Sequence, residues 1–171
     1  MEALLSAGEA PPATVESLVA ELAAALGARG RMLATAESCT GGLIAAACTA
    51  RAGSSTWFER GFVTYSNAAK AEMLGVPPLL IESQGAVSAE VAVAMAEGAL
   101  DRSLADLALS VTGIAGPGGA TPGKPVGTVW LALARRGEPA RPELLQLHGD
   151  RASIREQTVR IALQRVLASI D

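Results

Sequence analysis

Hydroxyl and thiol side chains gather at residues 37–42, where Glu-Ser-Cys-Thr precedes a pair of glycines. A hydroxyl at the end of a strand, followed by glycines and a helix start, faces backbone N–H groups that lack a partner within the helix. Such donors suit a developing oxyanion or a phosphate, which makes Ser38 a candidate nucleophile in a strand–turn–helix elbow. The G-x-S-x-G pattern of such elbows is absent, and spacing alone favours a simple helix cap at Ser38 or Thr40.

Cys39 is the rival nucleophile in this turn. Adjacent residues of an extended segment point to opposite sides, so only one of Ser38 and Cys39 faces a given pocket. The chain has two cysteines, Cys39 and Cys48, and one histidine, His148, which make neither a disulfide framework nor a site of several imidazoles. We therefore expect no metal and no cofactor, and chemistry carried by hydroxyls, carboxylates, lysine or backbone amides.

A lysine follows the only tyrosine of the chain, in the segment Tyr65-Ser-Asn-Ala-Ala-Lys70. Unlike arginine, lysine can act as a base near neutral pH when its pKa falls. Lowering the pKa from ~10.4 to ~7.4 requires about 4 kcal/mol of differential interaction, so burial or a nearby cation is needed. The alternative is an amphipathic helix whose single lysine extends to water, which is the default without other support.

A stretch rich in glycine and proline occupies residues 112–127. Glycines such as Gly113 and Gly116 allow close backbone approach, and consecutive N–H groups can form an anion-binding nest. The stretch is not a Walker A loop, because Lys124 is followed by proline and then by an expected strand. It can also be a plain irregular connection, but loops of ~15 residues in a compact domain are usually functional.

Two arginines, Arg151 and Arg155, open the last expected helix. Residues four apart share one helical face, so the pair can clamp a phosphate or a carboxylate. An ordinary solvated helix face explains the pair equally well. His148 is expected to be a strand residue and not a catalyst, because the spacing supplies no carboxylate to orient it.

The apolar pattern predicts the elements that must position these residues. Helices are expected at 15–26, 43–50, 67–74, 88–100 and 151–170, and strands at 32–35, 62–65, 107–111, 128–134 and 144–148. This order predicts an α/β fold, a three-layer α/β/α sandwich with a mixed, mainly parallel five-stranded sheet. Residues 113–127 join two strands without a helix, so these two can run antiparallel. Ligands of such folds bind where the loops after Thr35, Tyr65 and Val111 converge.

The composition indicates a globular protein and makes some classes of binding partner less expected. The 171 residues are 50% hydrophobic, with a net charge of −3, and fit a flexible lead-in at 1–13 followed by one domain at 14–171. No apolar run reaches the ~18 residues that span a bilayer, and the start lacks a basic signal region. We expect a cytoplasmic protein without a membrane partner. The acidic balance and the few aromatic residues disfavour nucleic acid.

Several motifs together resemble the CinA C-terminal domain family, which includes stand-alone bacterial nicotinamide-nucleotide amidohydrolases. They are T-A-E-S-C-T-G-G-L at 35–43, G-F-V-T-Y-S-N-A-A-K at 61–70, G-A-V-S at 85–88, S-V-T-G-I-A-G-P-G-G at 110–119, K-P-V-G-T-V at 124–129 and G-D-R at 149–151. The resemblance covers roughly residues 14–170. It implies a three-layer α/β/α fold with a mixed five-stranded sheet, often as a homodimer or a higher homo-oligomer.

The resemblance also implies an activity, the hydrolysis of nicotinamide mononucleotide to nicotinate mononucleotide and ammonia in pyridine-nucleotide salvage. The family's nucleophilic serine falls on Ser38, its tyrosine and lysine fall on Tyr65 and Lys70, and its glycine-rich loop begins at Thr112. Either Lys70 or Tyr65 can be the immediate base. The residues that we expect to bind the substrate are Glu37, Cys39, Thr40, Gly41, Gly42, Thr112, Gly113, Gly116, Arg151 and Arg155.

Two other functions remain as alternatives. A non-catalytic nucleotide-binding module that regulates a partner would keep residues 112–127 but would not need both Ser38 and Lys70. A phosphotransferase is disfavoured, because a GK[ST] motif and a clear pair of magnesium-binding carboxylates are missing. Ammonia release from the mononucleotide separates the first alternative from the enzyme.

Overall fold

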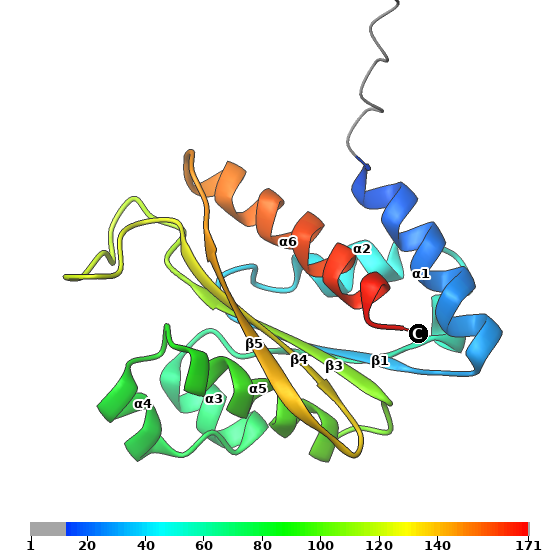
Figure 1. Ribbon diagram of the computed structural model, residues 1–171, viewed down its shortest axis with the longest axis horizontal. Helices are drawn as coiled ribbons and strands as arrows, with labels where there is room; N and C mark the ends of the chain where they lie inside the picture. Colours follow the sequence, from blue (N-terminus) through cyan, green and yellow to red (C-terminus); the bar gives the residue numbers. More distant parts are fainter. Residues whose placement is uncertain (1–12, 171) are drawn as a thin grey trace, which may run out of the picture.

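The computed structural model describes residues 13–170, and within them one sheet lies between two layers of helices (Figure 1). The expected lead-in at 1–13 lies outside the described residues except for Ala13. The helices are α1 (Val15–Arg29), α2 (Leu43–Thr49), α3 (Asn67–Leu74), α4 (Pro78–Gln84), α5 (Ala89–Asp101) and α6 (Arg151–Ala168), with a short 3₁₀ turn η1 (Ser54–Thr56). The strands are β1 (Leu33–Glu37), β2 (Phe58–Val63), β3 (Leu107–Gly113), β4 (Thr128–Arg135) and β5 (Glu138–Gln146).

The sheet of the described residues has five strands in the order β2-β1-β3-β4-β5. β1 pairs in parallel with β2 and β3, whereas β4 runs antiparallel to both β3 and β5. The expected mixed α/β sandwich is therefore confirmed, but "mainly parallel" describes only the half of the sheet around β1. The antiparallel half arises because no helix connects β3 to β4 or β4 to β5.

Each face of the sheet packs against its own helices. Helices α1, α2 and α6 cover one face, and α3, α4 and α5 cover the other (Figure 1). Successive residues of β1 divide between the two cores, with Leu33 in the first and Ala34 in the second. The second core is rich in alanine, and Gly98 of α5 faces the backbone of Leu74 so closely that a Cβ would not fit. Small side chains therefore let α3 and α5 pack near the sheet.

Three expected elements differ in the structure. Helix α4 was not predicted, because Pro77 and Pro78 indicated a break; Pro78 instead stands in the first turn of the helix, where its missing N–H is no loss. β2 ends at Val63, which places Tyr65 beyond the strand and not within it. β5 spans Glu138–Gln146 and not 144–148, since an edge strand tolerates prolines and polar residues that hide its pattern.

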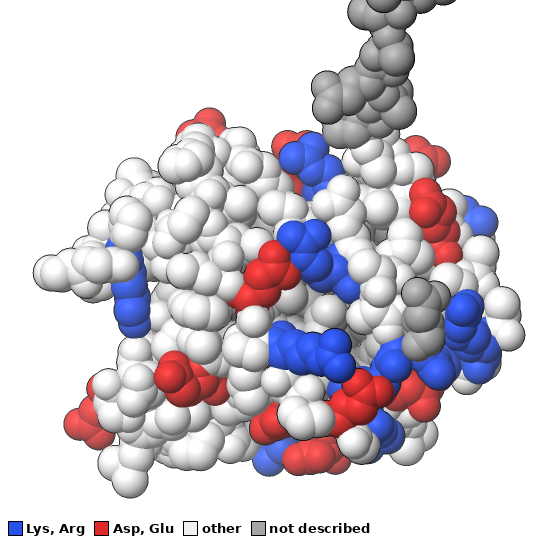
Figure 2. Space-filling model, viewed as in Figure 1, with Lys and Arg blue, Asp and Glu red and all other residues white. Residues whose placement is uncertain are grey.

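The surface that includes β5 carries charges of both signs. Figure 2 shows Lys and Arg side chains interspersed with Asp and Glu on this face. One such pair is Arg165 and Glu143, whose side chains form two hydrogen bonds of 2.7 and 2.8 Å. Among residues 13–170, no helix is long and apolar enough to cross a membrane.

The register of the parallel strands aligns the segments that follow them. Glu37 pairs with Val63 of β2 on one side and with Val111 of β3 on the other. The next residues along each chain, Ser38, Thr64 and Thr112, therefore lie side by side at the carboxyl edge of the sheet. This edge is where α/β folds bind ligands.

Candidate active site

Ser38 and Lys70 meet at the carboxyl edge of the sheet, although they are 32 residues apart in the chain. The Ser38 Oγ lies 3.0 Å from the Lys70 Nζ. Ser38 directly follows β1, and its N–H donates to the carbonyl of Val111 at 3.0 Å, which continues the parallel ladder by one residue. Lys70 belongs to α3, whose N-cap Ser66 accepts a hydrogen bond from the N–H of Ala69. The structure thus brings together the two residues predicted as nucleophile and base.

The Lys70 amine is buried, with only 1% of the residue exposed. Its Nζ also donates to the carbonyl oxygens of Thr64 at 3.0 Å and Tyr65 at 3.2 Å. Burial lowers the pKa of Lys70 from its ordinary value, because the charged form loses its hydration, while the neighbouring Cys39 opposes this in part. A neutral amine has two N–H bonds and one lone pair. The two carbonyls accept those N–H bonds, so the lone pair remains for the hydroxyl hydrogen of Ser38.

Cys39 shares this turn but is a poorer nucleophile. Burial raises the pKa of the Cys39 thiol to about 11, so the thiol is protonated near neutral pH. The nucleophile of a cysteine is the thiolate, and the turn does not favour its formation. The structure thus favours Ser38 over the rival that the sequence left open.

Glu37 holds the nucleophile turn from inside the protein. Its buried carboxylate accepts hydrogen bonds from the Thr40 hydroxyl at 2.6 Å and from the N–H groups of Gly42, Ile44 and Ala45 at 3.1, 3.0 and 2.8 Å. A negative charge at a helix N-terminus is favourable, since it satisfies donors that have no partner in the helix. Glu37 therefore caps α2, and its side chain is not part of the cavity wall.

Other residues expected at the substrate shape the same turn. Arg155 donates from Nε to the carbonyl of Cys39 at 3.2 Å and from Nη2 to that of Thr40 at 3.1 Å. Gly41 and Gly42 have φ angles of 59° and 100°, a region that side chains other than glycine rarely adopt. The geometry thus gives Arg155, Gly41 and Gly42 a role in positioning Ser38.

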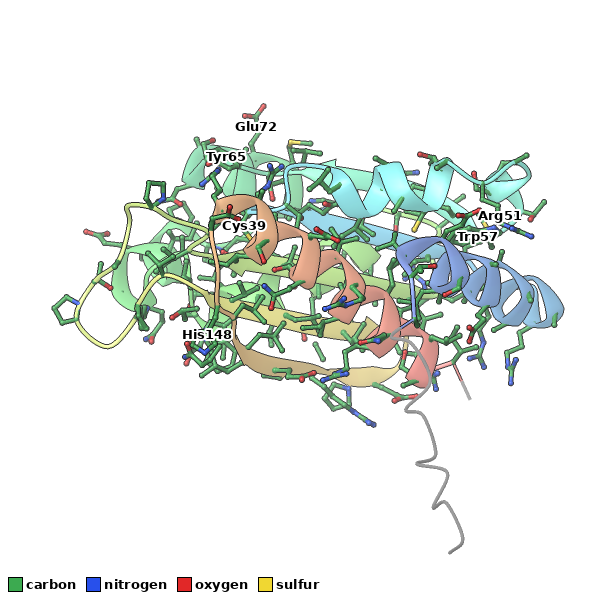
Figure 3. The ribbon with its side chains drawn as sticks, turned by 90° about the horizontal axis from the view of Figure 1, so that it is seen from above. Cys39, Arg51, Trp57, Tyr65, Glu72 and His148 are labelled. Carbon is green, nitrogen blue, oxygen red and sulfur yellow. The ribbon has the colours of Figure 1, made fainter. Side chains whose placement is uncertain are left out.

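A cavity of about 260 Å³ opens over the Ser38–Lys70 pair. Tyr65 and Cys39, both on its wall, lie at one end of the molecule, while Arg51 and Trp57 lie at the opposite end (Figure 3). The full lining is Ser38, Cys39, Tyr65, Asn67, Lys70, Ala86, Val87, Thr112, Gly113, Ala115 and Arg151. Segments from β1, β2, β3, α3 and α6 therefore enclose one space.

Arg151 spans one side of this cavity. Its Nη1 donates to the carbonyl of Gly116 at 2.8 Å, and its Nη2 donates to the Tyr65 hydroxyl at 3.2 Å. Tyr65 is 62% exposed, so its ring stands at the entrance and not beside Ser38. Elsewhere in the cavity lining, the Thr112 hydroxyl donates to the carbonyl of Ala86 at 2.8 Å. The arginine, the tyrosine and the glycine-rich loop thus form a polar rim.

Backbone geometry at the end of β3 directs an N–H group at Ser38. The N–H of Ile114 donates to Thr128 of β4, and N–H groups alternate between the two sides of a strand. The N–H of Gly113 therefore faces β1, which has ended at Glu37, and so faces the Ser38 turn. A Cβ at Gly113 would lie 2.6 Å from Val129 Cγ2, so only glycine fits without a shift.

The sequence reasoning missed four residues of the cavity wall. Asn67 carries an amide and stands between the predicted Tyr65 and Lys70, a position that could have marked it. Ala86, Val87 and Ala115 have no reactive group. Only their place in the motifs that resemble the family, at 85–88 and 110–119, could have indicated them. Within residues 13–170, no three His, Cys, Asp or Glu side chains come together as a metal site.

Comparisons with known proteins identify relatives of this chain. Residues 15–170 match the family model of the CinA C-terminal domain. The nicotinamide-nucleotide amidohydrolase PncC of Enterobacter agglomerans is 51% identical over 153 residues, which cover 90% of this chain and 93% of that protein. A crystal structure of the competence/damage inducible protein CihA from Agrobacterium tumefaciens has a TM-score of 0.89 and 46% identity, and the match covers 94% of this chain and 98% of that one.

Some relatives are much longer than this chain. A putative competence-damage inducible protein of Symbiobacterium thermophilum is 54% identical over 166 residues, which are only 37% of its length. The chain thus spans about a third of the length of such relatives, and nearly the whole length of the amidohydrolase of Enterobacter agglomerans.

Proposed function

This chain belongs to the CinA C-terminal domain family, and we propose that it is a nicotinamide-nucleotide amidohydrolase. The reaction converts nicotinamide mononucleotide and water to nicotinate mononucleotide and ammonia. One observation carries the proposal: the Ser38 Oγ lies 3.0 Å from a buried lysine amine at the base of a cavity. The relative of nearly equal length that bears the same activity in its name supports the choice of substrate.

In the first half of the reaction, the Ser38 oxygen attacks the carboxamide carbon of the pyridine ring. The neutral Lys70 amine accepts the hydroxyl proton as the C–O bond forms. The ammonium then returns this proton to the amide nitrogen as the C–N bond breaks. Ammonia leaves, and the nicotinoyl group remains as an ester on Ser38.

Backbone N–H groups stabilise the negative oxygen of the intermediate. The first amides of α2 are not free for this task, because Glu37 accepts those of Gly42, Ile44 and Ala45. The N–H of Gly113 faces the Ser38 turn, and we assign it as an oxyanion donor together with the N–H of Cys39, which follows the nucleophile as in other hydrolase elbows.

Water completes the cycle by attacking the ester. The Lys70 amine accepts a proton from the water and delivers it to the Ser38 oxygen as the ester C–O bond breaks. The product is the nicotinate carboxylate, and the net change is one water consumed and one ammonia released. The positive charge of the bound pyridinium helps to keep Lys70 neutral, since like charges disfavour each other.

The polar rim accounts for the nucleotide part of the substrate. Arg151 presents a guanidinium, which suits a phosphate, and the loop from Gly113 to Gly116 supplies backbone N–H groups. Arg151 and the loop residue Ala115 line the same cavity as the Ser38–Lys70 pair, so a mononucleotide that places its amide at the pair can place its phosphate at the rim. Lys70, and not the Tyr65 hydroxyl, is the immediate base in this proposal, because only the carbonyl of Tyr65 contacts the amine.

A non-catalytic binding module fits the site less well. Burying a lysine amine beside a serine hydroxyl destabilises a protein, and a module that only binds nucleotides has no use for the pair. For the same reason the elbow around Ser38 is more than a helix cap, because Glu37 already caps α2. The enzyme is therefore the better account.

The test is ammonia release from nicotinamide mononucleotide by the purified protein and by Ser38→Ala and Lys70→Ala variants. Both variants should lose at least about a thousandfold in kcat while they retain the circular dichroism spectrum of the parent. Lys124→Ala, which removes the only other lysine, is the matched control and should keep the kcat of the parent for ammonia release. Saturable binding of the mononucleotide without turnover by the parent protein would instead support the binding module.

We also propose a cytoplasmic location and a homo-oligomer, most simply a dimer. Support comes from the family resemblance alone. Light scattering coupled to gel filtration tests the assembly, and fractionation of the producing cells tests the location.

A further inference from the structure

Among the buried side-chain nitrogen and oxygen atoms of residues 13–170, one has no hydrogen-bond partner, the hydroxyl oxygen of Thr64. The residue itself is fully buried. Buried hydroxyls are almost always paired, and a native exception calls for an explanation such as a catalytic role. Its position is informative, because the Thr64 backbone already serves the proposed active site.

Thr64 lies directly beside the Ser38–Lys70 pair. Its N–H donates to the carbonyl of Glu37 at 2.8 Å, and its carbonyl accepts from the Lys70 Nζ at 3.0 Å. The parallel register pairs Glu37 with Val63, so Ser38 and Thr64 are next to each other and on the same face of the sheet. Phe62 and Ala36 belong to the core on the α3 side, and alternation places the side chains of Thr64 and Ser38 on that side as well.

During the reaction the Lys70 ammonium loses one of the three acceptors that surround it in the resting site. As an ammonium it has three N–H bonds, and the carbonyls of Thr64 and Tyr65 accept two of them. The third points to the Ser38 oxygen, which is bonded to the former amide carbon in the tetrahedral intermediate and is then a poorer acceptor than the free hydroxyl. A rotation of Thr64 about its Cα–Cβ bond moves the hydroxyl among three staggered positions, and the backbone carbonyl of the same residue already contacts the amine.

We propose that the Thr64 hydroxyl is a positioning group for Lys70 that accepts the third N–H of the ammonium. This inference rests on the proposed function, in which Lys70 carries the proton between Ser38 and the leaving ammonia. By stabilising the ammonium, the hydroxyl makes the buried amine a stronger base. The Thr64 hydroxyl oxygen, which has no partner in the resting structure, is then the acceptor that the protonated Lys70 amine uses during the reaction.

Few other groups lie where they can stabilise the protonated Lys70 amine. The titratable or charged groups on the cavity wall beside Lys70 are the Cys39 thiol, the Tyr65 phenol and the Arg151 guanidinium. The Glu37 carboxylate is bound to α2 on the other face of the sheet. From the helix layer, α5 presents apolar residues such as Val91 and Met95 to the core, and Glu72 of α3 and Glu82 of α4 are exposed.

The test uses the two lysines of the chain. Protein labelled with ¹³C at lysine Cε gives one signal for Lys70 and one for Lys124, and the Lys70 signal is followed against pH in unliganded Ser38→Ala protein, in which the serine oxygen no longer accepts the third N–H. When Thr64→Val, which keeps the shape and removes the hydroxyl, is added to Ser38→Ala, the Lys70 midpoint should fall by about one pH unit. Thr64→Ser should restore it, and the Lys124 signal should not move in either variant.

The outcomes separate this inference from the proposed function. An unchanged Lys70 midpoint on removal of the Thr64 hydroxyl would overturn the inference. A more stable fold beside it would identify a merely orphaned hydroxyl, whose removal should only stabilise the protein. The titration needs no substrate, so it stands even where the mononucleotide is not hydrolysed. Where it is hydrolysed, kcat of Thr64→Val should fall about tenfold at the plateau with KM unchanged, and Thr64→Ser should recover it.

Discussion

The phenol oxygen of Tyr65 lies 3.2 Å from Nη2 of Arg151, on the rim of the cavity, while the carbonyl of the same tyrosine accepts a hydrogen bond from Lys70. The backbone carbonyl of Tyr65 thus contacts Lys70, and its side chain contacts Arg151 at the cavity entrance. We therefore expect loss of the phenol oxygen to affect KM and not kcat, because the carbonyl contact to Lys70 is kept.

Replacing Tyr65 with phenylalanine should leave kcat within about threefold of the parent, since the carbonyl contact to Lys70 is kept. KM should rise, because Arg151 loses one of its partners at the rim. Steady-state ammonia release measures both constants. A loss in kcat comparable to that of Lys70→Ala would show that the phenol takes part in proton transfer.

Arg151→Ala should raise KM for the mononucleotide by about 10- to 100-fold, with a smaller effect on kcat, because a charge-assisted contact to the phosphate is lost. Arg160 of the same helix offers a matched control, since Arg160→Ala removes a charge outside the cavity lining. Activity on the corresponding nucleoside, which lacks the phosphate, shows whether the rise in KM comes from lost phosphate recognition. If Arg151→Ala impairs the nucleoside as strongly as the nucleotide, the arginine does not recognise phosphate.

Glu37→Gln should lower the free energy of unfolding by about 3 kcal/mol, because an amide cannot accept all the donors that the buried carboxylate satisfies. Urea unfolding followed by circular dichroism measures the change. Glu72→Gln, at an exposed position of α3, should change stability by less than about 0.5 kcal/mol. Equal stability of the two variants would contradict the capping role of Glu37.

The lowered pKa of Lys70 gives stability a defined pH dependence. Between the folded pKa and the ordinary value of 10.5, the unfolded chain binds a proton that the folded chain does not, so stability rises with pH in this window. Lys70→Met should therefore be more stable than the parent at neutral pH, and the difference should shrink as the pH approaches 10.5. Urea midpoints across this range provide the check, and a constant difference would mean that Lys70 ionises as in the unfolded chain.

The same amine should control the rate. Only neutral Lys70 can accept the Ser38 proton, so kcat/KM should rise with pH through the lowered pKa and then level off. A pH–rate profile of ammonia release shows this limb. A rate that falls over the same range would mean that the protonated amine is the active form.

Strand ends and glycine turns have strong local signals, so the residues alone marked Ser38 and Lys70 as candidates and predicted the edge of the sheet where they lie. Their roles as nucleophile and base came from the family resemblance, since spacing alone favoured a helix cap and a lysine that extends to water. The sequence did not predict that Glu37 and Arg155 contact the turn itself, since both bonds depend on tertiary packing between α2, α6 and the sheet. Helix α4 was missed because proline is read as a break even where it starts a helix. The orphaned Thr64 hydroxyl has no sequence signal, because a missing partner is visible only in three dimensions.

Arg151 and Arg155 lie one turn apart on α6, and each contacts a different part of the site. One reaches the loop and the tyrosine at the rim, and the other holds the carbonyls behind the nucleophile. Helix α6 therefore ties the rim of the cavity and the turn that carries Ser38 to a single element, so the spacing between these two parts of the cavity is set by one helical turn.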